Sequence, residues 1–178
     1  MPDEPRSTIY ILDTSALRNI HSRSPQAFRK LKPYCRDGVV RVPSAVIREV
    51  QHGKDKLKNL LPQWAKKYDS FEIGDTDPAF KAYITEIMRN YGGEFRVGNY
   101  KSRGLSEGRD KRHGADVQVV AAAKFIKTKG KDIAVVSDDK GIKDACMLEN
   151  LVCISWQEFI RRLGLSRLFQ GQQQSRQR

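Results

Sequence analysis

The stretch that decides the fold lies at residues 9–17 and reads Ile-Tyr-Ile-Leu-Asp-Thr-Ser-Ala-Leu. Its first four residues form a short apolar run, which is typical of a strand buried on both faces of a parallel sheet. Asp13 follows this run directly, and Thr14 and Ser15 then open a helical pattern. The stretch therefore predicts a buried strand that places a carboxylate at its carboxyl end, where a helix begins.

The remainder of the chain repeats this alternation of strand and helix. Short apolar runs at residues 39–42, 71–73, 132–136 and 151–154 predict strands, and amphipathic stretches between them predict helices. Ser44 is expected to cap the helix that follows the second strand. Such alternation favours an α/β fold, a doubly wound parallel sheet with helices on both faces. In folds of this kind, ligands bind at the carboxyl ends of the strands, where the strand order reverses.

A length of 178 residues suits a single domain. We expect residues 1–8 to be an N-terminal extension, residues 9–169 to form the domain, and residues 170–178, which are polar and rich in Gln, to be a disordered tail. Residues 91–114 are rich in glycine and basic side chains and show no sustained period. They predict a long basic loop, and long loops in compact domains are usually functional or disordered.

The composition narrows the choice of partners. The formal net charge of +12 favours a polyanion, with nucleic acid ahead of an anionic membrane surface. No apolar run is long enough to cross a membrane, and the first residues lack the apolar core of a secretory signal. The three cysteines are odd in number and form no C-x-x-C, so they indicate neither a disulfide framework nor a zinc site. These features predict a cytoplasmic protein without a membrane partner.

Four acidic residues occupy the positions at which such a fold gathers functional groups. Asp13 and Asp139 follow buried strands, Asp116 lies in the first turn of a predicted helix, and Glu49 lies in the helix after the second strand. Converging carboxylates need a cation or shifted pKa values, and all-oxygen ligands suit Mg²⁺ or Mn²⁺. Each acid also has a structural interpretation, because Asp favours helix starts and a Glu on a helix is often solvated.

The motifs that carry these acids resemble those of the PIN-domain ribonucleases. Residues 9–17 are similar to the opening motif of that family, and residues 42–50 (Val-Pro-Ser-Ala-Val-Ile-Arg-Glu-Val) are similar to its P-x-x-V-x-x-E helix. Residues 114–123 (Gly-Ala-Asp-Val-Gln-Val-Val-Ala-Ala-Ala) resemble the third motif, and residues 134–142 (Ala-Val-Val-Ser-Asp-Asp-Lys-Gly-Ile) resemble the fourth. All four occur in the family's order, from residue 9 to about residue 160.

The resemblance implies a PIN-like fold and a metal-dependent endoribonuclease that leaves a 5′-phosphate and a 3′-hydroxyl. It implies that Mg²⁺ or Mn²⁺ is bound by Asp13, Glu49, Asp116 and Asp139, with Ser137, Asp138 and Ser15 in supporting roles. Many small members are toxins held in check by a protein inhibitor, so an antitoxin partner is implied by analogy, and a homodimer is left open. The sequence departs from the pattern at Ile142, where the family has an aromatic residue, and in its longer, more basic region between residues 68 and 114.

The basic region predicts the track for RNA. Between residues 91 and 131 the chain carries ten basic and four acidic residues, with aromatic residues interleaved that are suited to stacking on unpaired bases. The cations expected to contact RNA are Arg96, Lys101, Arg103, Arg109, Lys111 and Arg112. The alternative is a solvated loop with incidental charge.

Other functions fit the sequence less well. A non-catalytic RNA-binding module on the same fold is the nearest alternative, and the complete set of four acids argues against it. A phosphatase of the haloacid dehalogenase type needs a second Asp two positions after the first, where this chain has Ser15. A dinucleotide-binding protein needs G-x-G-x-x-G after the first strand, and the sequence has none there.

Overall fold

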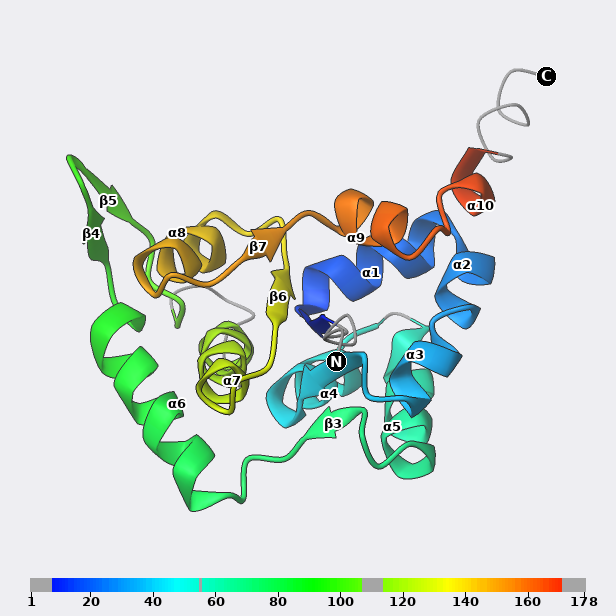
Figure 1. The fold of residues 1–178 in the computed structure, drawn as a ribbon, viewed down its shortest axis with the longest axis horizontal. Coiled ribbons are helices and arrows are strands. Elements are labelled where there is room, and N and C mark those ends of the chain that lie inside the picture. Colours follow the sequence, from blue (N-terminus) through cyan, green and yellow to red (C-terminus); the bar gives the residue numbers. More distant parts are fainter. Residues whose placement is uncertain (1–7, 55, 107–113, 171–178) are drawn as a thin grey trace, which may run out of the picture.

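Five parallel strands form the central sheet of the computed structural model, which describes residues 8–54, 56–106 and 114–170. The strands of the structure are β1 (Ile9–Leu12), β2 (Val40–Pro43), β3 (Glu72–Ile73), β4 (Phe95–Val97), β5 (Tyr100–Ser102), β6 (Ile133–Val136) and β7 (Cys153–Ile154). The helices are α1 (Thr14–Arg23), α2 (Pro25–Arg29), α3 (Lys32–Arg36), α4 (Ser44–Gln51), α5 (Leu57–Lys67), α6 (Pro78–Tyr91), α7 (Ala115–Thr128), α8 (Lys140–Leu148), α9 (Trp156–Arg162) and α10 (Arg167–Gln170). Figure 1 shows their arrangement.

The strand order reverses between β1 and β6. The sheet runs β3-β2-β1-β6-β7, so the chain builds outward from β1 to β3 and then returns to place β6 on the other side of β1. Leu12 pairs with Val136, the last residues of the two strands. The residues that follow them, Asp13 and Ser137, therefore lie side by side at this switch point. The α/β fold with a doubly wound parallel sheet, as predicted from the sequence, is confirmed.

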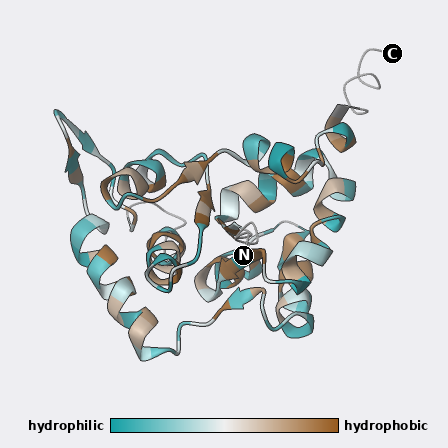
Figure 2. Cartoon of the chain, in the orientation of Figure 1, coloured by the Kyte–Doolittle hydropathy of each residue, from teal (hydrophilic) through white to brown (hydrophobic). Residues whose placement is uncertain are grey.

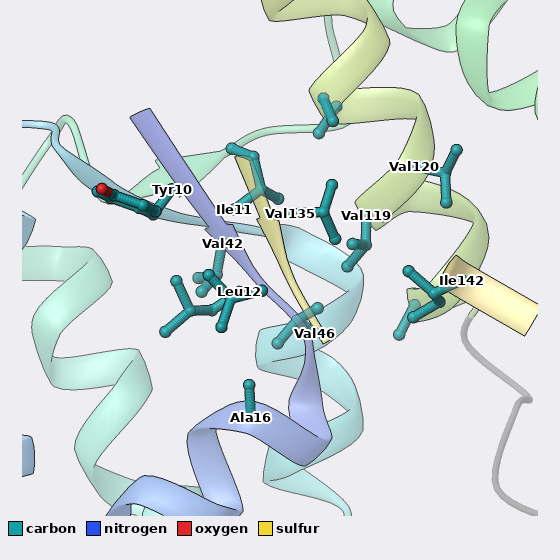
Figure 3. Close-up of a cluster of buried hydrophobic side chains, with 14 of the residues drawn as sticks. Tyr10, Ile11, Leu12, Ala16, Val42, Val46, Val119, Val120, Val135 and Ile142 are labelled. Carbon is teal, nitrogen blue, oxygen red and sulfur yellow. The ribbon is translucent and has the colours of Figure 1, made fainter. Parts of the chain in front are cut away.

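Helices cover both faces of the sheet. Figure 3 shows Tyr10 and Leu12 on one side of β1 and Ile11 on the other, where Val119 of α7 packs. On the Tyr10 side the ring of Phe159 in α9 lies 5.0 Å from the Tyr10 ring, measured between centroids. Strand β1 is buried along its whole length. In Figure 2 the strands β6 and β7 are brown, whereas the outer turns of α9 carry hydrophilic residues.

Short polar side chains fix where several helices begin. Asp13, Asp139 and Ser155 each accept a hydrogen bond from a backbone N–H in the first turn of the helix that follows. Helix α4 is different, and the prediction that Ser44 caps it is wrong. Pro43 occupies the cap position, and the Ser44 hydroxyl donates instead to Oε1 of Glu72, at 2.6 Å.

A backbone N–H at the N-terminus of α4 donates a hydrogen bond to a side chain from another helix. Oε1 of Gln118, a buried side chain of α7, accepts a hydrogen bond of 3.3 Å from the backbone N–H of Ala45. Nε2 of Gln118 lies 3.4 Å from Asp75, which also forms a 2.6 Å ion pair with Arg48 of α4. These contacts hold α4 against α7 and thereby set the spacing between the two helices that carry Glu49 and Asp116.

The prediction of an unstructured loop over residues 91–114 is wrong for its first half. Helix α6 extends to Tyr91, and β4 and β5 then form an antiparallel hairpin. Val97 pairs with Tyr100, so the turn is the two-residue Gly98-Asn99, and Gly98 has the positive φ of 56° that favours glycine. Figure 1 shows this hairpin beside α8, at the edge of the molecule. Residues 107–113 lie outside the described residues.

The described elements run from β1, which begins at Ile9, to α10. The final described element, α10, ends at Gln170, one residue into the stretch expected to be a tail, while residues 1–7 and 171–178 lie outside the described residues. No helix in the described part of the chain has both the length and the apolar character that crossing a membrane requires.

The base of the hairpin predicts a sharp response to one substitution. A Cβ at Gly104 would collide with the backbone carbonyl oxygen of Gly92, which also accepts a hydrogen bond from the Ser106 N–H. We expect Gly104→Ala to lower the free energy of unfolding by about 1–3 kcal/mol, as overpacking does in close-packed sites. Gly74→Ala is the matched control, because the nearest atom to a Cβ there is 3.9 Å away. Denaturant unfolding measures both, and equal effects would contradict this packing of the hairpin base.

Candidate active site at the strand switch point

Asp13 is the carboxylate around which the site is built. It is 2% exposed, and its two oxygens accept three hydrogen bonds from the chain. Oδ1 accepts from the backbone N–H of Ala16 at 2.6 Å, and Oδ2 accepts from the hydroxyls of Ser15 at 2.8 Å and Ser137 at 2.6 Å. The first bond caps α1, so part of the role of Asp13 is structural. The bond from Ser137 crosses the switch point and ties the ends of β1 and β6 together.

Ser137 also joins Asp13 to Asp139. Its fully buried hydroxyl oxygen accepts a 3.0 Å hydrogen bond from the Asp139 backbone N–H while its proton is donated to Asp13. The Asp139 carboxylate caps α8 through a 3.1 Å bond from the Ile142 N–H, and its second oxygen lies 3.3 Å from Arg103. The supporting role predicted for Ser137 therefore corresponds to a hydroxyl that bonds to both strand-end acids.

The neighbouring acid Asp138 points to a different partner. Its carboxylate lies 3.5 Å from the Lys143 ammonium, and the residue is exposed. The backbone N–H of Asp139, by contrast, donates a hydrogen bond to the Ser137 hydroxyl. The two adjacent acids therefore have different partners at this turn.

Glu49 and Asp116 reach the same region from α4 and α7. Burial raises the pKa of Glu49 to about 7, and the charge of Asp116 adds to the rise. Burial likewise raises the pKa of Asp13 to about 6, against the three hydrogen bonds that lower it, and Asp116 again contributes a smaller rise. Asp13, Glu49 and Asp116 are therefore close enough to repel one another electrostatically, and the fold concentrates negative charge beside the switch point.

Two residues near Glu49 were not singled out from the sequence. Arg18 lowers the pKa of Glu49 by its charge, and the Thr14 hydroxyl lowers it further. The Thr14 side chain is buried beside Glu49. Thr14 and Arg18 are four residues apart in α1, so they lie on the same helix face, which was a signal available in the sequence.

The four predicted acids do not form a closed metal cage. Among the described residues there is no group of three or more His, Cys, Asp or Glu side chains placed to hold a metal ion. The donors present still fit Mg²⁺, which is commonly bound by one or two carboxylates and completes its shell with water and phosphate oxygens. The all-oxygen donor set supports that fit, and the four-carboxylate metal site remains a prediction.

The cations predicted to bind RNA divide into two groups. Arg96, Lys101 and Arg103 lie on or just after the hairpin and are exposed, with Lys101 in a 2.6 Å ion pair with Glu94. Arg103 contacts Asp139 and so links the hairpin to the switch point. The remaining three, Arg109, Lys111 and Arg112, lie outside the described residues.

Two cavities lie elsewhere and contain none of the four acids. The larger, of about 470 Å³, is lined by Thr8, Asp132 and Ile133 at the amino ends of β1 and β6, and the smaller, of about 300 Å³, lies between β3 and the end of α7. Ligands of doubly wound sheets bind at the switch point, and the side chains gathered there make it the candidate site.

The chain matches a known family, but the description of that family names no activity. Residues 10–167 match the family described as "Domain of unknown function (DUF4411)", and this range includes every acid of the switch point. No curated protein matches the chain.

The raised pKa values predict how stability depends on pH. Because Asp13 has a higher pKa in the folded chain than its ordinary 3.8, the folded state holds this proton more tightly than the unfolded state. Its stabilising contribution is complete below about pH 4 and is lost as pH rises through about 6. In EDTA, the free energy of unfolding of Asp13→Asn relative to wild type should therefore rise by roughly 1–2 kcal/mol between about pH 5 and about pH 8. Denaturant titrations measure this difference, and parallel pH profiles would contradict the raised pKa.

Proposed function

The chain belongs to the DUF4411 family, whose description names no activity, and from its switch-point acids we propose that it is a metal-dependent endoribonuclease of the PIN type. The observation that carries the proposal is the buried Asp13 carboxylate, bonded to Ser15 and Ser137 and repelled by Asp116. A fold that needed only a helix cap would gain nothing from gathering Glu49 and Asp116 around it. Concentrated, partly buried carboxylates at a strand switch point are suited to hold a hydrated cation against a phosphate.

The proposed reaction is hydrolysis of an RNA phosphodiester. The oxygen of a water molecule bonds to phosphorus as the bond from phosphorus to the 3′-oxygen breaks. The water gives up a proton, and the departing 3′-oxygen takes up a proton. The products are a 5′-phosphate and a 3′-hydroxyl. A divalent cation at the site would neutralise phosphate charge and lower the pKa of a bound water. Asp13, Glu49, Asp116 and Asp139 are the residues that would hold it.

The residues of the chain supply the remaining requirements. Ser137 and Ser15 orient the Asp13 carboxylate by donating to Oδ2. Because Oδ1 accepts one bond from the Ala16 N–H, one lone pair of Oδ1 is left for a cation. Burial raises the pKa of Glu49 to about 7 in the metal-free chain, and a bound divalent cation would compensate the charge of this carboxylate. The net charge of +12 supports a polyanionic substrate.

The resemblance to toxin-type members extends the proposal to a protein inhibitor. Growth arrest on expression of the wild type but not of Asp13→Asn, relieved by a gene adjacent to this one, would support a toxin with an antitoxin partner. Equal growth with both proteins would count against the toxin role and leave the ribonuclease proposal standing.

The requirement for a divalent cation predicts the effect of chelation. Cleavage of single-stranded RNA should occur with Mg²⁺ or Mn²⁺, stop in excess EDTA, and return when the cation is restored. The products should carry 5′-phosphates, read out by end-labelling before and after phosphatase treatment. Undiminished cleavage in EDTA would overturn the metal-dependent mechanism, and tight RNA binding without cleavage under any condition would favour the non-catalytic module.

The adjacent acids of the fourth motif give a matched pair of variants. Asp139→Asn keeps the acceptor that caps α8 but removes the charge, and we expect the rate to fall by about 100-fold or more, as for the loss of a group that fixes a cation. Asp138→Asn removes only the exposed pairing with Lys143 and should stay within about threefold of the wild type. Rates under identical cation and RNA concentrations test this. An active Asp139→Asn beside an inactive Asp138→Asn would shift the motif register by one residue.

A further inference from the structure

The carboxylate of Asp144 in α8 binds two hydroxyls of the hairpin. The Tyr100 hydroxyl donates to its Oδ1 at 2.7 Å and the Ser102 hydroxyl donates to its Oδ2 at 2.5 Å. The Lys140 ammonium lies 3.1 Å from the same Oδ2 and 3.9 Å from the centre of the Tyr100 ring. Burial alone would raise the pKa of Asp144, but these three donors outweigh it and lower the pKa. Asp144 is therefore an ionised anchor for β5.

The backbone that follows β5 is fixed at two further points. A Cβ at Gly141 of α8 would lie 3.0 Å from the Arg103 carbonyl oxygen and 3.1 Å from Oδ1 of Asp139, so this glycine allows a close approach. On the other side, the Leu105 N–H donates to the Tyr91 carbonyl at 2.8 Å and the Leu105 side chain is fully buried. Arg103 thus projects from a segment held on both sides.

The Arg103 side chain itself remains accessible. It is 57% exposed, and its Nη2 lies 3.3 Å from Oδ2 of Asp139. A guanidinium has five N–H donors in a planar fork that matches the geometry of phosphate oxygens. Pairing with Asp139 uses the Nη2 end, so donors remain for a second anion beside the switch point.

We propose, on the premise that the site hydrolyses RNA, that Arg103 is a catalytic residue that binds a non-bridging oxygen of the scissile phosphate, and that Asp144 is the positioning residue for it. As water adds to phosphorus and the bond to the 3′-oxygen breaks, the equatorial oxygens concentrate negative charge. A guanidinium fixed beside them stabilises that charge without reorganising. The hairpin, which the fold does not need for its sheet, then has a purpose in the reaction.

The other described cations of the hairpin have different positions. Lys101 is paired with Glu94, and Arg96 is an exposed residue that lies opposite Lys101 in the ladder. Arg103 differs from both in its contact with Asp139, an acid of the switch point. Lys101 and Arg96 are suited to contact phosphates away from the scissile bond, which makes Arg96 a matched control for Arg103.

The test compares steady-state cleavage of a single-stranded RNA oligonucleotide with Mn²⁺ by the wild type, Arg103→Gln and Arg96→Gln. Arg103→Gln should lower kcat by about 100-fold or more, the usual cost of losing one transition-state donor, with a smaller effect on KM. Arg96→Gln should raise KM a few-fold and lower kcat far less than Arg103→Gln does, because Arg96 is expected to contribute to RNA binding away from the scissile bond. Added guanidinium ions should restore part of the kcat of Arg103→Ala but have no effect on Arg96→Ala.

One further variant, Asp144→Asn, and two further measurements, thermal melting and RNA binding, distinguish a catalytic role of Arg103 from a structural one. Asp144→Asn should lower kcat less than Arg103→Gln does, since the arginine is present but less well held. Arg103→Gln should melt at the wild-type temperature and, in EDTA, bind the RNA within about threefold of wild type by fluorescence anisotropy. A loss of kcat without guanidinium rescue, or accompanied by a lower melting temperature, would overturn the catalytic role.

The remaining outcomes distinguish the two levels of the proposal. An unchanged kcat in Arg103→Gln, with an active wild type that Asp13→Asn abolishes, would overturn the role of Arg103 and leave the ribonuclease intact. A wild type that cleaves no RNA with either cation would overturn both.

Discussion

The hydrogen bond from the Ser137 hydroxyl to the Asp13 carboxylate is the contact on which the site depends. It joins the ends of β1 and β6, the two neighbouring strands between which the sheet reverses its order. The same hydroxyl accepts the Asp139 N–H, so one buried side chain sets the spacing of two acids from segments more than a hundred residues apart. Because Asp13 is buried, its hydrogen bonds are needed to keep the carboxylate ionisable at all.

Holding these acids together lowers the stability of the folded chain near neutral pH. The pKa values of Asp13 and Glu49 are raised chiefly by burial and further by Asp116, so ionising them near neutral pH disfavours the folded chain. Such a cluster is expected where a cation or a substrate compensates the charge, and perturbed carboxylates of this kind concentrate at functional sites. The Gln118 bonds to Ala45 and Asp75 counter the repulsion, since they hold α4 and α7 at a fixed spacing.

The local elements of the fold were predictable because local chemistry determines them. The apolar run before Asp13 and the helix starts at Asp139 and Trp156 follow from burial pattern and capping. The hairpin was missed although Gly98-Asn99 between alternating strands is a turn signal, because its three-residue strands are too short to show a period. Ser44 was misjudged because a residue distant in sequence, Gln118, takes over the cap.

The candidate site likewise has features that depend on local sequence and features that depend on long-range packing. Strand ends and motif spacing located Asp13 and Asp139, since both depend on local order in the chain. The contact between Arg103 and Asp139 depends on how the hairpin packs on α8, a long-range arrangement with no periodic signal in the sequence. The geometry of the acids likewise reflects packing between α1, α4 and α7, which is why the residues were predictable but their spacing was not.

The most direct test of the metal-dependent site is a crystal of the chain soaked in Mn²⁺ near neutral pH, with anomalous scattering used to locate the cation. We predict an anomalous peak at the switch point, within coordination distance of Asp13 or Asp139, that is absent from crystals of Asp13→Asn. A well-diffracting, Mn²⁺-soaked crystal with no peak there, or with its only peaks distant from all four acids, would contradict the account.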